Sequence, residues 1–131
     1  MSLPEEPLFL TKEQVLAYHR QQIALFGGSG GLGDEGLFES ALGQPQTTWC
    51  YDATADLFDL AAAYAFHLAK NHAFEDGNKR DALEAAVGFL GVNGVTLDVS
   101  QEALFDTMIA LVTSVIDKRK FASFLRAHHS A

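Results

Sequence analysis

The chain has 131 residues, of which 48% are hydrophobic and 20% are charged, and we expect one soluble domain over residues 1–131. Seventeen Asp and Glu residues outnumber nine Lys and Arg residues. The resulting net charge of −8 argues against direct nucleic-acid binding, which needs cations to neutralise phosphates. No apolar run approaches the roughly 20 residues of a membrane span. The single cysteine and the lack of a secretory signal predict a cytoplasmic protein without an internal disulfide.

Two helices are predicted before the middle of the chain. Thr11 and Gln14 have the spacing of a capping box, which predicts a helix that runs to about residue 26. Its inward side chains are expected to be Val15, Leu16, Ile23 and Phe26.

A second, shorter helix is predicted over about residues 35–42, with Asp34 as its N-cap. Gly43 and Pro45 predict its end, because glycine ends helices and proline lacks the N–H that would continue one. Residues 44–52 are therefore expected to be irregular.

The central helix is predicted over about residues 54–70, and it is apolar around nearly its whole circumference. Such a helix is covered by neighbours on several sides. His67 lies on it, and we interpret His67 as a structural histidine.

Three more helices are predicted after the centre of the chain. One ends near Asn93, one runs over about residues 101–116 with Ser100 as its N-cap, and a short one follows the N-cap Asp117. Residues 95–99 are expected to be briefly extended. The total is about six helices with negligible strand, so the predicted fold class is a compact all-α bundle.

The segment His-Ala-Phe-Glu-Asp-Gly-Asn-Lys-Arg at residues 72–80 concentrates the chemistry of the chain. His72 follows the central helix, and its imidazole can accept a proton from an attacking hydroxyl near neutral pH. Asp76 is a hard oxygen ligand of the kind that Mg²⁺ takes beside phosphate oxygens. These two residue types predict a base and a metal ligand in one loop.

The second half of the segment predicts an anion site at a helix N-terminus. Gly77 permits close backbone approach, Asn78 can hydrogen-bond a phosphate, and Lys79 and Arg80 bring two positive charges. The alternative is a polar loop in which Asp76 or Asn78 only caps the next helix. Several positions that each fit phosphoryl transfer favour the functional interpretation.

At these residues the chain resembles the Fic/Doc family, whose motif is His-x-Phe-x-Asp/Glu-Gly/Ala-Asn-Gly/Lys-Arg. The resemblance extends to the Doc branch, the death-on-curing toxins of toxin–antitoxin modules, through residues 33–42 and 56–58. It implies a compact α-helical domain. It also implies that His72 is the catalytic base, that Asp76 holds Mg²⁺, and that Gly77, Asn78, Lys79 and Arg80 bind the phosphates of ATP.

Two positions bear on the reaction that the resemblance implies. Family members that transfer AMP usually have Gly in place of Lys79 and Arg in place of Leu83. Doc-type toxins share both departures and resemble kinases that pass the γ-phosphate of ATP to a protein hydroxyl. Asp81 replaces a small Thr or Ser, and its carboxylate would either weaken the anion site or face solvent.

By the same resemblance, the expected protein substrate is elongation factor Tu, modified on a threonine so that translation stops. A separately encoded antitoxin is the expected partner, because an inhibitory Ser/Thr-x-x-x-Glu-Gly/Asn segment is absent: Gly31 stands where it needs Ser or Thr. Two other interpretations stay open, a Fic-type AMP transferase and a catalytically silent binding protein.

Overall fold

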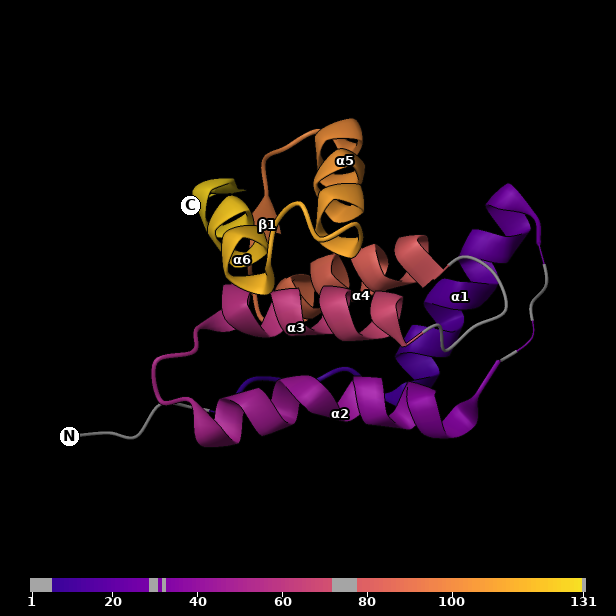
Figure 1. Ribbon diagram of the computed structural model, residues 1–131, viewed down its shortest axis with the longest axis horizontal. Coiled ribbons are helices and arrows are strands. Elements are labelled where there is room, and N and C mark those ends of the chain that lie inside the picture. The colour runs from indigo at the N-terminus through magenta and orange to yellow at the C-terminus, as the bar shows by residue number, and fades with distance from the viewer. Residues whose placement is uncertain (1–5, 29–30, 32, 72–77, 131) are drawn as a thin grey trace.

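The computed structural model describes residues 6–28, 31, 33–71 and 78–130, and it shows a helical bundle with one small sheet (Figure 1). The all-α prediction with about six helices and negligible strand is confirmed. Two short strands, β1 (Thr96–Leu97) and β2 (His129–Ser130), pair antiparallel. The helices of the described part are α1 (Lys12–Phe26), α2 (Glu35–Tyr51), α3 (Leu57–Lys70), α4 (Asn78–Val92), α5 (Gln101–Val112) and α6 (Lys118–Ala127).

Helix α3 is the centre of the bundle, as its apolar circumference predicts. It packs against α4, α2, α6 and α5, and eight of its fourteen residues are buried. It begins at Leu57 rather than near residue 54, because Asp56 caps it and Asp52 holds Thr54 in the preceding turn. No helix in the described part of the chain is long and apolar enough to cross a membrane.

Helix α2 runs through Gly43 and Pro45 to Tyr51, so the predicted end at residue 42 and the irregular segment 44–52 are wrong. Phe38, Ala41 and Pro45 are buried, and their spacing of three and four residues places them on one face against α3. This packing outweighs the local cost of the proline.

Helix α5 ends at Val112, four residues before the predicted end. Ser114 has a φ of 64°, a left-handed conformation that helices do not continue through. The Val115 N–H then donates to the Ala110 carbonyl at 2.9 Å, which satisfies a carbonyl of the last turn.

Helix α1 has the predicted capping box at Thr11 and Gln14, but its buried face differs from the prediction. Val15, His19 and Gln22 are buried, whereas Phe26 is 60% exposed. A polar stripe therefore faces the protein interior, and an aromatic ring stands at the surface. The hydrophobic pattern alone pointed to the wrong face in the last turns.

Helices α1 and α4 run antiparallel and approach closely. The last residue of α1, Phe26, lies by Arg80 at the start of α4, and Tyr18, two turns earlier, lies by Gly88. A Cβ atom at residue 88 would stand 2.3 Å from the Tyr18 hydroxyl oxygen. Glycine at this position lets the two helices pack at this distance.

The segment before α1 is tied to the core by Leu10 and Phe9. The buried Leu10 N–H donates to the Tyr64 hydroxyl at 2.9 Å, and the Phe9 ring stacks on Phe89 with centroids 5.9 Å apart. These contacts join the N-terminal segment to α3 and α4.

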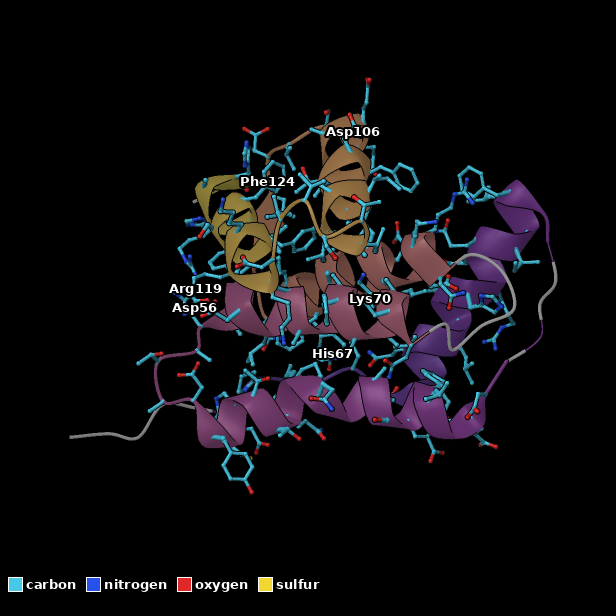
Figure 2. All side chains as sticks on the ribbon, in the orientation of Figure 1. Asp56, His67, Lys70, Asp106, Arg119 and Phe124 are labelled. Atoms are coloured by element: carbon cyan, nitrogen blue, oxygen red, sulfur yellow. The ribbon has the colours of Figure 1, made fainter. Side chains whose placement is uncertain are left out.

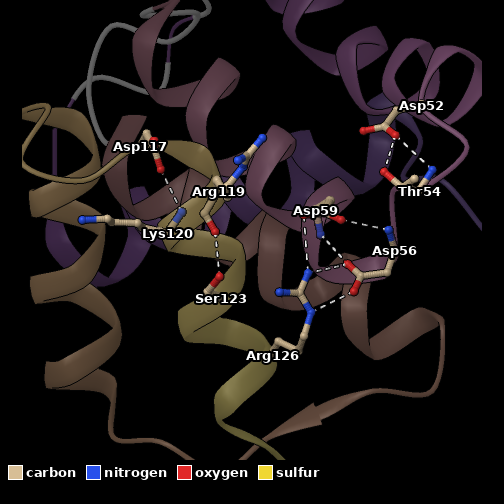
Figure 3. A network of polar contacts seen from close by, with 9 residues as sticks. All are labelled: Asp52, Thr54, Asp56, Asp59, Asp117, Arg119, Lys120, Ser123 and Arg126. Carbon is tan, nitrogen blue, oxygen red and sulfur yellow. Dashed lines mark hydrogen bonds and ion pairs between the residues drawn. The ribbon is translucent and has the colours of Figure 1, made fainter.

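The N-terminal end of α3 is joined to α6 through Arg126. Figure 3 shows its guanidinium donating to both oxygens of Asp56, at 2.8 and 3.0 Å, and to Asp59 at 3.4 Å. Asp56 and Asp59 also form the capping box of α3. The network is exposed, so its contribution to stability is small.

Candidate functional site

The motif begins outside the described residues and ends inside them. His72, Asp76 and Gly77 lie outside the described residues, so their predicted roles stay predictions. Asn78, Lys79 and Arg80 form the first turn of α4, where the sequence predicts a helix start. Helix α4 begins beside the last turn of α1, where Arg80 lies by Phe26 (Figure 1).

The first turn of α4 presents positive charge to solvent. Lys79 and Arg80 are exposed, Asn78 is half-buried, and neither cation makes an ion pair with any residue that the structure describes. The first N–H groups of a helix lack carbonyl partners within the helix, and its dipole is positive at this end. This set of donors fits the phosphate groups of a nucleotide.

Arg80 is held by aromatic rings. Its Cζ atom lies 4.2 Å from the centroid of the Phe26 ring in α1 and 6.0 Å from that of Phe105 in α5. All three residues line a cavity of about 460 Å³ between α1, α4 and α5. Gln22 and Leu83 line the same cavity.

Asp81 does not face solvent, which corrects one of the two expectations for it. Its side chain is fully buried, and Oδ2 lies 2.5 Å from His19 Nδ1. Burial raises the pKa of the Asp81 carboxyl to about 6, while the His19 hydrogen bond acts in the opposite direction. The carboxylate is thus directed to α1 and paired, one residue after the exposed cations.

Leu83 is buried with 6% of its surface exposed, as its interpretation as an apolar core residue predicts. It belongs to the core cluster that includes Leu90 and Phe89. Helix α4 therefore presents no third cation on the turn that follows Arg80.

His67 fits the predicted structural role. It lies half-buried on α3 (Figure 2), with Nε2 3.3 Å from the Lys118 ammonium nitrogen. Burial, assisted by the Lys118 charge, lowers the pKa of His67 to about 4. The imidazole is neutral at pH 7 and can accept the Lys118 hydrogen bond.

The described residues contain no group of three His, Cys, Asp or Glu side chains that could hold a metal ion. The predicted Mg²⁺ ligand, Asp76, is outside them. The cationic turn of α4 has the donors and positive charge that suit a phosphate group.

His19 and Phe26 belong to this site, and sequence reasoning missed the contribution of both. The signal was present in the spacing of His19, Gln22 and Phe26, which places three non-aliphatic side chains on one face of α1. The burial of His19 against the helix that carries Asp81 is a tertiary contact, which the spacing alone does not predict. The expectation that Phe26 faces inward hid its contact with Arg80.

Comparisons with known proteins agree with the motif. The sequence pattern of the Fic/DOC family matches residues 9–90. The chain is 36% identical to "Protein kinase doc" of Escherichia phage P1, over 89% of this chain and 92% of the relative. It is 40% identical to "Toxin Doc" of Mycolicibacterium smegmatis, over 94% of this chain and 95% of the relative.

Proposed function

Because the chain belongs to the Fic/DOC family, we propose that it is the toxin of a toxin–antitoxin module and a protein kinase. It transfers the γ-phosphate of ATP to a hydroxyl of a host protein and releases ADP. The names of the two relatives, "Protein kinase doc" and "Toxin Doc", support both halves of this proposal. The motif at residues 72–80 lies within the family match, and its resemblance to Doc-type toxins agrees with these names.

One structural observation carries the choice of reaction: Lys79 is exposed in the first turn of α4 while Leu83 is buried in the core. AMP-transferring relatives place Gly and Arg at these positions. A lysine would crowd a pocket shaped for the inner phosphates, and a buried leucine cannot clamp the γ-phosphate. The pair therefore favours transfer of the terminal phosphate over transfer of AMP.

Six of the motif residues carry the proposed chemistry of this reaction. His72 accepts the proton of the attacking hydroxyl, and Asp76 holds Mg²⁺. Gly77, Asn78, Lys79 and Arg80 bind the phosphates. The exposed cations on α4 stabilise the charge that develops on the transferring phosphoryl group. Bound Mg²⁺ supplies further neutralisation of the phosphate oxygens.

The proposed target is a threonine of elongation factor Tu, and its modification stops translation. The proposed partner is a separately encoded antitoxin, because an unrestrained toxin would stop growth of its own host. The reaction takes place in the cytoplasm and needs no direct contact with nucleic acid, in keeping with the net charge of −8.

The test combines growth with intact mass. Expression of the chain should arrest growth, and His72→Ala should relieve the arrest because the base is lost. His129→Ala, at an exposed histidine of β2, is the matched control and should leave the arrest unchanged. Purified elongation factor Tu incubated with the chain, Mg²⁺ and ATP should gain the mass of one phosphate.

Other outcomes separate the rival functions. A gain of one AMP would replace the kinase by a nucleotidyl transferase. Growth arrest that persists in His72→Ala would favour a catalytically silent binding protein.

A further inference from the structure

Arg80 is the motif cation whose side-chain contacts the structure gives in detail. Its guanidinium lies 4.2 Å from the Phe26 ring centroid, within cation–π range, and no described carboxylate pairs with it. Glu84 and Glu102 line the same cavity, and neither forms an ion pair with Arg80. Within the part of the chain that the structure describes, an aromatic ring and no carboxylate holds the guanidinium.

A ring and a carboxylate would have different consequences for phosphate binding. A carboxylate neutralises the guanidinium and occupies its N–H donors. An aromatic face attracts the cation without neutralising it, and the donors of a guanidinium lie in its plane, where a phosphate can reach them. The ring also restricts the long Arg80 side chain before phosphate binds, so that binding loses less conformational entropy.

Packing against the core does not account for an aromatic side chain at Phe26. It is 60% exposed at the end of α1, where the side chain contributes little to the core. Contacts in the preceding turns of α1 nevertheless fix the position of Phe26 relative to α4. The buried pair of His19 and Asp81 and the close approach of Tyr18 to Gly88 hold the two helices in register.

We propose that Phe26 is a positioning residue for the transfer reaction: its ring holds the Arg80 guanidinium ready for a phosphate of ATP and leaves its charge and donors available. The inference rests on the proposed function, because it needs a reaction in which Arg80 binds phosphate. Phe105, 6.0 Å from the same guanidinium, is the weaker second ring.

The experiment measures kcat and KM for ATP in the transfer reaction, using the full chain. Phe26→Leu removes the ring and keeps an apolar side chain, and kcat/KM should fall about two- to fivefold, the range of an exposed cation–π contact. Phe26→Tyr keeps the ring and should restore the wild-type value. Leu25→Ala, at the neighbouring exposed residue that lines the same cavity, is the control and should change nothing.

A double-mutant cycle with Arg80→Ala makes the test specific. If Phe26 acts through Arg80, then Phe26→Leu should have no further effect once the guanidinium is absent. Additive effects, or a Phe26→Tyr variant as slow as Phe26→Leu, would overturn the inference and leave the proposed function intact. Absence of any transfer by the unmodified chain would instead overturn the proposed function, and the inference with it.

Discussion

At the scale of single residues, Asp81 is an unusual neighbour for a phosphate-binding turn. Its carboxylate is fully buried one residue after Arg80, yet it points to His19 on another helix. Burying a charge is expensive unless a partner compensates for it. The pair therefore directs the negative charge of Asp81 to α1 and joins α1 to the first turn of α4.

Replacing one member of this pair should lower the free energy of unfolding more than replacing both. His19→Leu leaves a buried carboxylate with its partner lost, and we expect the free energy of unfolding to fall by about 3–5 kcal/mol. The double variant His19→Leu, Asp81→Leu leaves no buried charge and should be more stable than His19→Leu. Urea denaturation at pH 7 measures both.

The difference in stability between these two variants should change with pH in a predictable direction. Burial raises the pKa of Asp81, and loss of the His19 hydrogen bond raises it further. A group with a raised pKa in the folded state contributes stability below its unfolded pKa, and this is lost as pH rises through the folded value. The free energy of unfolding of His19→Leu should therefore lie closer to that of the double variant at pH 5 than at pH 7. A deficit that does not change with pH would contradict an ionised Asp81.

At the scale of helices, the sequence predicted most of the bundle because capping residues and apolar periodicity are local signals. Thr11, Asp34, Ser100 and Asp117 all cap the helices that they were predicted to cap. The motif was predicted to open a helix, and Asn78 begins α4.

The errors occurred where tertiary packing decided the outcome. Pro45 predicts a helix end, but its burial against α3 keeps α2 continuous. Phe26 looks like a core residue, but its ring covers Arg80 at the surface. The contacts of Asp81 with α1 depend on which helices become neighbours, and no local pattern states that. Sequence spacing therefore predicted the motif, while the helix that supports it was visible only in the structure.

The contact between the N-terminal segment and α3 gives a testable prediction at this scale. Tyr64→Phe removes the only acceptor among the described residues that the buried Leu10 N–H uses, and should lower the free energy of unfolding by about 1–3 kcal/mol. Tyr51→Phe, at a tyrosine 88% exposed, is the control and should have little effect. Equal stability of the two variants in urea would show that the hydrogen bond contributes nothing.

At the scale of the whole molecule, an acidic chain places two exposed cations at one helix start and supports that turn from a neighbouring helix. Helix α3 precedes the motif in the chain, and α4 begins within the motif at Asn78. Helix α1 packs against the first turn of α4 (Figure 1). The family match spans residues 9–90, which include α1, α3 and all but the last two residues of α4. The proposed kinase activity thus depends on a support that extends well beyond the motif.

The position of a transferred label tests this account most directly, without assuming the identity of the target. A host extract is incubated with the chain, Mg²⁺ and ATP labelled either on the γ-phosphate or on the α-phosphate. We predict that a host protein is labelled only from γ-labelled ATP, and that His72→Ala abolishes the label. Labelling of a host protein from α-labelled ATP would contradict the account, because AMP would then be the group transferred.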